Sequence, residues 1–197
     1  SPDAVKAYVK KGLTVCVESG AGAGSFMSDD VYKAAGATIA KGAAVLKGAD
    51  IVLAVRRLSD AGIKALKKGA IVAAQLDPHG DRANLDAMAK QGVSAFAMEL
   101  VPRITRAQSM DVLSSQANLA GYKAVIDAAA HFSRAFPMMM TAAGTVPAAR
   151  VFIMGAGVAG LQAIATARRL GAVVSATDVR AAAGEQVASL GAKFVFV

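Results

Sequence analysis

Three glycines near the C-terminal end of the sequence have the spacing of a dinucleotide-binding turn. Gly155, Gly157 and Gly160 form the pattern G-x-G-x-x-G, and Asp178 follows Gly157 by 21 positions. In such a turn the first glycine permits a sharp bend, the second lets a pyrophosphate approach the backbone, and the third lets the helix pack closely on the strand. Because an apolar strand is predicted before the turn and a helix after it, we expect phosphates to bind at the helix N-terminus.

Asp178 predicts which dinucleotide binds. Its carboxylate would accept hydrogen bonds from the adenosine ribose hydroxyls and repel a 2′-phosphate, which favours NAD(H) over NADP(H). Arg180, two positions further on, weakens this argument slightly. The alternative interpretation is a tight strand-to-helix turn that binds no ligand. The residues predicted to bind the cofactor here are Gly155, Ala156, Gly157, Val158, Ala159, Gly160, Asp178, Val179 and Arg180.

A second group of polar residues lies between positions 102 and 116, directly after a predicted strand. Arg103, Gln108 and Asp111 combine a guanidinium, an amide and a carboxylate, which together could fix a carboxamide and a ribose. Doubly wound sheets place their ligands at such strand ends. An exposed polar connector would have the same composition, so the residues alone leave both interpretations open.

The elements that must position these residues alternate along the whole chain. Short apolar strands separated by helices and glycines indicate an α/β protein with parallel sheets. The predicted strands cover residues 13–18, 38–40, 49–55, 70–76, 93–98, 150–154, 172–177 and 193–197. The predicted helices include a long one over 115–136, one over 159–170 and one over 183–190, and a loop is predicted over 137–150.

This pattern predicts two doubly wound, Rossmann-like parallel-sheet domains. Residues 1–114 are expected to form an N-terminal α/β domain with one open sheet, and residues 115–149 a connecting long helix and loop. Residues 150–197 are expected to form the first half of an NAD-binding Rossmann domain, which this chain leaves incomplete, because such a fold needs about six strands.

Composition excludes several other classes of function. The net charge is +8 over 197 residues, but the basic residues are scattered without interleaved aromatics, so we expect no nucleic-acid partner. No apolar run reaches the ~20 residues of a membrane span, and we expect no membrane insertion, no signal peptide and no metal site. Cys16, in an apolar run, is expected to be a buried inert thiol in a protein from a reducing compartment.

Several segments outside the glycine turn resemble one family specifically. These segments are residues 103–111, residues 118–122, the Met-rich residues 136–141 and residues 142–147. Together with the turn they resemble the NAD(H)-binding component of proton-translocating nicotinamide nucleotide transhydrogenase, and the resemblance covers essentially the whole chain. It implies that Arg103, Gln108 and Asp111 are catalytic residues that, with Ser114, position the nicotinamide and its ribose.

The resemblance also implies partners and a place in the cell. Hydride would pass from NADH to NADP⁺ held on an NADP(H)-binding component, coupled to proton movement through a separate membrane component. The chain would be a peripheral homodimer at the cytoplasmic or mitochondrial matrix face of the membrane. The family has one more strand before residue 1, the other half of the nucleotide domain after residue 197, and a mobile loop that closes over NAD(H).

Two alternatives remain open from the sequence. Alanine dehydrogenase, a relative with the same two-domain plan, needs a lysine and a histidine, because proton transfer accompanies hydride transfer. This chain has Arg56 and Arg57 where the lysine falls, and Pro78 and Asp77 displace His79 from the position of the histidine. Transhydrogenation requires no such pair. The other alternative is an NAD(H)-binding fragment without turnover.

Overall fold

The computed structural model describes residues 1–196, which form two compact units. The first unit is Ser1–Ile104 and the second is Thr105–Val197. Both contain parallel β-strands connected by helices, so the predicted α/β class is confirmed. The finer division at residues 114 and 149 stays a prediction.

The first half of unit Ser1–Ile104 is built around a two-stranded parallel sheet. Its elements are α1 (Pro2–Lys10), β1 (Cys16–Glu18), η1 (Ala23–Ser25), α2 (Asp29–Ala34), β2 (Thr38–Ala40) and η2 (Gly42–Val45). Ser1 begins α1 by accepting a hydrogen bond from the Ala4 amide at 3.4 Å, and Pro2 occupies the first helical position, as their residue types predict. Val5 and Tyr32 pack the two helices onto this small sheet.

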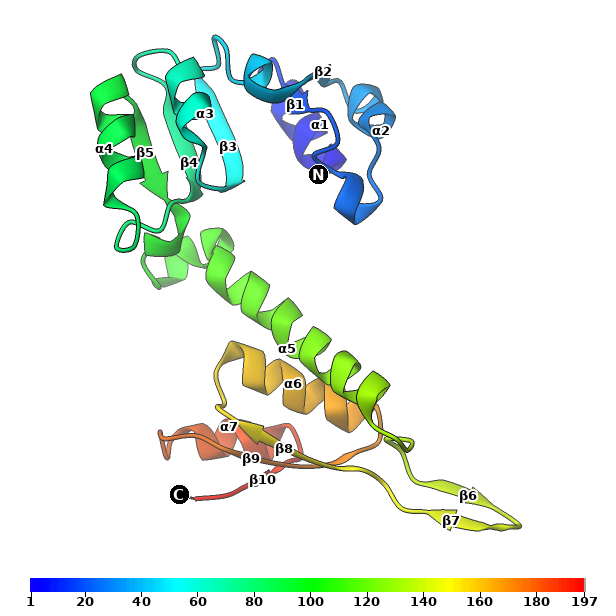
Figure 1. Ribbon diagram of the computed structural model, residues 1–197. Coiled ribbons are helices and arrows are strands. Elements are labelled where there is room, and N and C mark those ends of the chain that lie inside the picture. The colour runs from blue at the N-terminus through cyan, green and yellow to red at the C-terminus, as the bar shows by residue number, and fades with distance from the viewer. Residues whose placement is uncertain (197) are drawn as a thin grey trace. The chain divides into compact units, whose positions relative to one another are not determined.

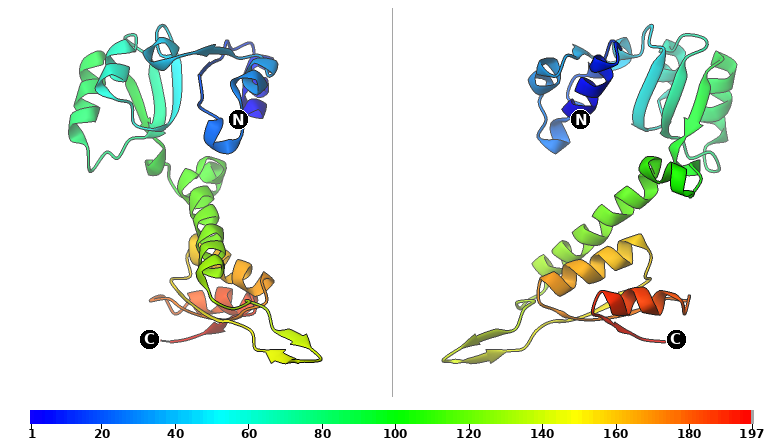
Figure 2. Two further views of the ribbon diagram at one scale, coloured as in Figure 1. Left: turned by 45° about the vertical axis from the view of Figure 1, so that its right-hand side comes forward. Right: turned by 180° about the vertical axis from the view of Figure 1, so that it is seen from behind.

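The second half of the unit forms a separate three-stranded parallel sheet in the order β3-β4-β5. Its elements are β3 (Ile51–Arg56), α3 (Asp60–Ala65), β4 (Ile71–Gln75), α4 (Arg82–Gln91), β5 (Ser94–Ala97) and η3 (Met98–Leu100). Helices α3 and α4 lie on one face of this sheet (Figures 1 and 2), where Ile63 and Met88 pack against Val52 and Val72.

The expectation of one open sheet in this region of the chain is wrong. Within residues 1–196, β2 pairs with β1 and β3 pairs with β4, and no ladder joins the two sheets. Between them the chain forms η2, and Leu46 then packs into the core of the second sheet instead of continuing a strand. The prediction of a buried Cys16 is also wrong, because Cys16 and Glu18 lie on the exposed face of β1 and only Val17 is half-buried.

Unit Thr105–Val197 contains the glycine turn. Its elements are η4 (Thr105–Met110), α5 (Val112–His131), β6 (Met139–Thr141), β7 (Gly144–Val146), β8 (Arg150–Met154), α6 (Val158–Arg169), β9 (Val173–Thr177), α7 (Ala183–Ser189) and β10 (Lys193–Phe194). Strands β10-β9-β8 form a parallel sheet. Ile164 of α6 and Val187 of α7 are fully buried against Val174 and Ala176 of β9. This packing fixes the strand, turn and helix around Gly155.

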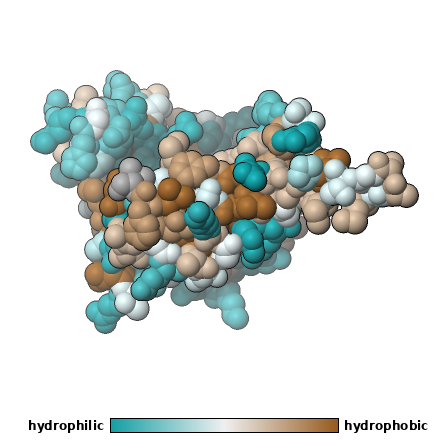
Figure 3. All heavy atoms as spheres, turned by 90° about the horizontal axis from the view of Figure 1, so that it is seen from below, coloured by the Kyte–Doolittle hydropathy of each residue, from teal (hydrophilic) through white to brown (hydrophobic). Residues whose placement is uncertain are grey.

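Two apolar surfaces of this unit are exposed within residues 1–196. One is the sheet face opposite α6 and α7, where Phe152 and Met154 are 53% and 82% exposed (Figure 3). The other is an antiparallel hairpin of β6 and β7, a pair of strands where the sequence predicted a loop. All six residues of its strands are exposed, and the hairpin extends away from the sheet of its unit in both views of Figure 2.

None of the helices described in residues 1–196 combines the length and the apolar composition needed to cross a membrane.

Candidate functional site

The glycine turn has the geometry that its spacing predicts. Gly155 follows β8 with φ +94°, a conformation that favours glycine, and its amide donates to the Thr177 carbonyl at 2.8 Å. A Cβ on Gly160 would lie 1.7 Å from the Gly155 carbonyl oxygen, so α6 can approach the turn only because residue 160 is glycine. A Cβ on Gly157 would meet nothing within 4 Å. The backbone at Gly157 is therefore open on the side where a pyrophosphate would approach.

Asp178 closes the turn from the end of the neighbouring strand. Its Oδ2 accepts a hydrogen bond from the Ala156 amide at 2.7 Å, although 22 residues separate the two in sequence. The ladder between β8 and β9 places Met154 opposite Thr177, which brings the two strand ends together. The structure therefore unites the glycine pattern and its acidic residue in one small site, as the sequence predicts.

Arg180 also binds this carboxylate. Its Nε donates to Oδ1 at 2.9 Å and its Nη2 to Oδ2 at 3.1 Å, while its own amide donates to Oδ1 at 2.8 Å. These bonds, the side-chain ones first, and the Ala156 amide hold the pKa of Asp178 well below its usual range. The same ion pair raises the pKa of Arg180. Sequence reasoning placed Arg180 at the site but missed its bond to Asp178.

The remaining predicted residues of the turn are accessible. Val179 is 102% exposed and Val158, the first residue of α6, is 43% exposed. An open glycine backbone at a helix N-terminus, next to an acidic side chain at the following strand end, fits a dinucleotide with its pyrophosphate at the turn. The residues present therefore fit NAD(H).

In the polar segment the structure brings Asp111 and Ser114 together. Asp111 is the N-cap of α5, and its two carboxylate oxygens accept from the Ser114 amide at 2.9 Å and the Ser114 hydroxyl at 2.7 Å. The predicted start of this helix near residue 115 was therefore too late. An aspartate three positions before a serine, ahead of a helical pattern, is the signal that could have located the cap.

Gln108 and Arg103 are both exposed. Gln108 lies in η4, three residues before the cap of α5. Arg103 belongs to the other unit, Ser1–Ile104. The roles of Arg103, Gln108, Asp111 and Ser114 toward a nicotinamide stay predictions.

Helix α5 connects the polar segment to the glycine turn within one unit. A Cβ on Gly121 would lie 2.0 Å from the carbonyl oxygen of Ala159, so α5 contacts the first turn of α6 at its backbone. Asn118 Nδ2 also donates to Gln162 Oε1 at 3.2 Å. About ten residues of helix, or roughly 15 Å, separate Asp111 from this contact. Sequence reasoning missed Gly121, whose signal was an isolated glycine inside a helical pattern.

The residues that the sequence compared with an alanine dehydrogenase site form an ion-pair network in unit Ser1–Ile104. Arg57 lies 3.4 Å from Asp77 and 3.2 Å from Asp81. The Leu76 and Asp77 amides donate to Glu99 Oε1 at 2.8 and 2.6 Å. Arg57 is therefore committed to carboxylates of its own chain.

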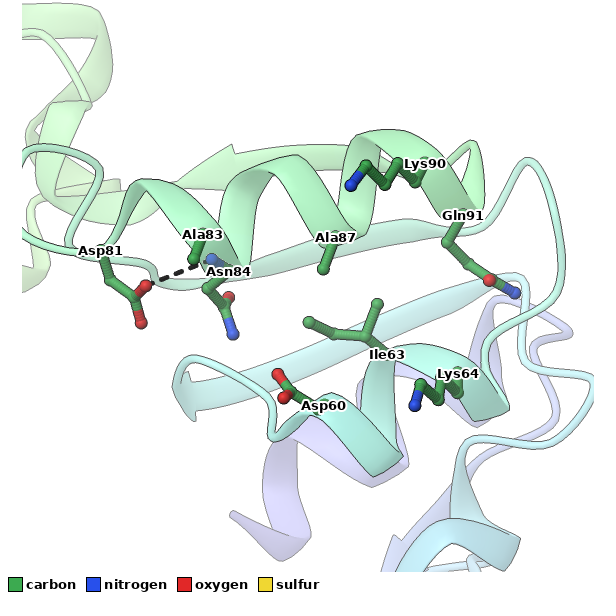
Figure 4. A pocket seen from close by; sticks show the side chains of 9 residues that line it. All are labelled: Asp60, Ile63, Lys64, Asp81, Ala83, Asn84, Ala87, Lys90 and Gln91. Atoms are coloured by element: carbon green, nitrogen blue, oxygen red, sulfur yellow. Dashed lines mark hydrogen bonds between the residues drawn. The ribbon is translucent and has the colours of Figure 1, made fainter.

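A groove of about 560 Å³ lies between α3 and α4 in the same unit. Figure 4 shows Asp60 and Asp81 at one end and Lys64 and Lys90 toward the other. None of the residues predicted to bind the cofactor lines it. The nucleotide site is thus an open turn on the other unit and not this groove.

The fold and the turn define a dinucleotide-binding α/β protein. Comparison with known families makes the assignment specific, because the sequence matches the N-terminal domain of the alanine dehydrogenase/PNT family over residues 1–120 and its C-terminal domain over residues 124–197. The chain belongs to this family.

Individual relatives agree with the resemblance to transhydrogenase. The chain is 58% identical over 203 residues to an NAD(P) transhydrogenase alpha subunit of Rhodospirillum rubrum, covering 100% of the chain and 53% of that protein. A crystal structure of transhydrogenase from Sinorhizobium meliloti matches with a TM-score of 0.95 at 65% identity, covering 99% of the chain and 58% of that structure. The chain thus spans about half the length of the curated relatives it matches.

The fold is shared more widely than the sequence. An L-alanine dehydrogenase structure matches with a TM-score of 0.85 at 24% identity, covering all of the chain and 56% of that structure. At this identity the match establishes the fold alone.

Proposed function

We propose that this chain is the NAD(H)-binding portion of a nicotinamide nucleotide transhydrogenase. The observation that carries the proposal is the bond between the Asp178 carboxylate and the Ala156 amide, which joins the glycine turn to the acidic residue of a ribose site. The similarity to a transhydrogenase alpha subunit over 100% of the chain supports the same function.

When bound, the reduced nicotinamide supplies the hydride, and this chain supplies binding and orientation. The glycine turn would hold the pyrophosphate on helix α6, and Asp178 would accept the ribose hydroxyls. Arg103, Gln108 and Asp111, with Ser114, would orient the nicotinamide end. No acid or base is needed, because hydride transfer between two nicotinamide rings moves no substrate proton at the ring.

The partners follow from this function. The hydride acceptor is NADP⁺ on a separate NADP(H)-binding component, and a membrane component couples the transfer to proton translocation. The chain would be peripheral, at the cytoplasmic or mitochondrial matrix face. We also propose a homodimer, supported by the exposed β6–β7 hairpin, whose residues 138–148 carry no charge. Apolar, uncharged surfaces are typical of permanent interfaces.

A direct test measures two reactions of the full-length protein. Equilibrium titration should give tight binding of NADH and much weaker binding of NADPH. Mixing the NADH-loaded protein with an NADP(H)-binding component should give single-turnover transfer of hydride. Binding of NADH without any transfer would support the alternative of a non-catalytic NAD(H)-binding protein, and the absence of NADH binding would refute both.

Alanine dehydrogenase activity is not supported by the geometry. Arg57, near the position where that chemistry needs a lysine, is bound to Asp77 and Asp81. His79 lies in a turn after Asp77, which itself has φ +51°, and the backbone there differs from a simple continuation of the strand.

A further inference from the structure

The Asp178 carboxylate is saturated with hydrogen bonds before any nucleotide binds. Within residues 1–196 it accepts four, from the Ala156 amide, the Arg180 amide, and Nε and Nη2 of Arg180. An ionised carboxylate has about four acceptor positions. Ribose hydroxyls can therefore bind Asp178 only if one or more of these donors leaves.

The four donors are not equally replaceable. Two are backbone amides of the turn and of the strand end, and moving them would disrupt the site. The other two belong to a guanidinium whose side chain is 63% exposed, whereas the Asp178 side chain is 7% exposed. Water can take over the hydrogen bonds of an exposed guanidinium at little cost. The Arg180 fork is thus the group that must be displaced.

We propose that Arg180 sets the nucleotide preference of this site by competing with the adenosine ribose hydroxyls for Asp178. The inference rests on the proposed function, because it assumes that this turn binds NAD(H). It makes Arg180 a residue that opposes NADH binding, which is the reverse of an ordinary contact residue. The competition also keeps the guanidinium paired and unavailable to other anions.

The second consequence concerns a 2′-phosphate. A guanidinium fork matches the geometry of phosphate oxygens and binds them through two parallel hydrogen bonds. In the wild type Asp178 neutralises this fork and also repels the phosphate. Replacing the carboxylate would remove the repulsion and release Arg180 at the same time, so the two residues should act on NADPH binding through each other.

The test is equilibrium titration of the full-length protein with NADH and with NADPH. The variants are Arg180→Ala, Arg180→Lys, Asp178→Asn and the double variant, and Arg169→Ala is the charge-matched control because Arg169 lies at the far end of α6. We expect Arg180→Ala to tighten NADH binding by about two- to fivefold, the range set by an ion pair with one exposed partner. Arg180→Lys should fall between the two, and the control should match the wild type.

Asp178→Asn should weaken NADH binding and tighten NADPH binding. Adding Arg180→Ala to it should cancel the gain for NADPH, by about tenfold. NADH binding that is unchanged or weaker in both Arg180 variants, measured against Arg169→Ala, would overturn the inference while leaving the proposed function intact. A wild type that binds no NADH would overturn both.

Discussion

Gly121 in α5 lies so close to Ala159 in α6 that a methyl group at position 121 would stand 2.0 Å from the Ala159 carbonyl oxygen. Ala159 belongs to the glycine turn, and α5 begins at the cap formed by Asp111. The contact therefore fixes how far the polar segment lies from the nucleotide site, using two backbones in direct contact. A long helix with a bulkier residue at this position could not approach α6 as closely.

We predict that Gly121→Ala destabilises the protein and weakens NADH binding. In an isolated helix this substitution would stabilise by about 1 kcal/mol. Here the new methyl group meets backbone, which cannot rotate away, and overpacking of this kind costs about 1–3 kcal/mol. Thermal unfolding and NADH titration would measure both effects. Gly24→Ala is the control, because a Cβ there meets nothing within 4 Å. A Gly121→Ala protein as stable as the control would contradict the close contact.

Gln108→Ala should slow hydride transfer more than it weakens NADH binding. The glycine turn and Asp178 would still hold the adenosine half, while the nicotinamide would lose a contact that orients it. A misplacement of about 1 Å can cost on the order of a hundredfold in rate. Single-turnover transfer to the NADP(H)-binding component and equilibrium binding should be measured on the same preparation. The exposed Gln116 of α5 gives a matched control in Gln116→Ala. If the rate falls only in proportion to binding, Gln108 does not orient the nicotinamide.

The ion pair at Asp178 predicts a pH dependence of stability. Its pKa is depressed in the folded protein, first by the Arg180 side chain and then by the Arg180 and Ala156 amides. The unfolded chain should titrate near the ordinary value of about 3.9. The contribution to stability is therefore fully present above about pH 4 and is lost as the pH falls toward the folded-state pKa. Denaturant unfolding from pH 7 down to pH 3 should show the difference between wild type and Asp178→Asn shrinking below about pH 4. A constant difference would exclude this linkage.

No alanine-dependent reduction of NAD⁺ should be observed, nor NADH oxidation with pyruvate and ammonia. The reason is that Arg57 is bound to two aspartates where a lysine would be needed, and no histidine follows β4 directly. An absorbance assay at 340 nm, with an alanine dehydrogenase as positive control, measures both directions. Turnover with alanine would reverse the ranking of the two enzyme functions.

The nucleotide turn was predictable because local rules determine it. Glycine spacing, a preceding apolar strand and an acidic residue at the next strand end each have a steric or electrostatic reason, and β8 was located at residues 150–154 as predicted. The saturation of Asp178 was not predictable, because it depends on the rotamer of Arg180 and on the register of β8 against β9.

The errors had nonlocal causes. The break between β2 and β3 depends on where Leu46 packs, and the β6–β7 hairpin has no strong strand pattern in its Met-rich sequence. Asp111 was chosen for its chemistry, and its function as a helix cap explains its position equally well. Its role toward a nicotinamide therefore depends on the resemblance to transhydrogenase and on the experiment with Gln108.

The bond between Ala156 and Asp178 has a consequence for the kinetics of binding. Because the turn is already fastened by its own carboxylate, a dinucleotide arriving at Gly157 does not have to order a mobile loop. Association at the adenosine end should then be fast and show little conformational lag, and exchange of the Ala156 amide proton with solvent should be slow even in the apoprotein. The only rearrangement required there is the rotation of one exposed arginine side chain, which occurs in picoseconds to nanoseconds.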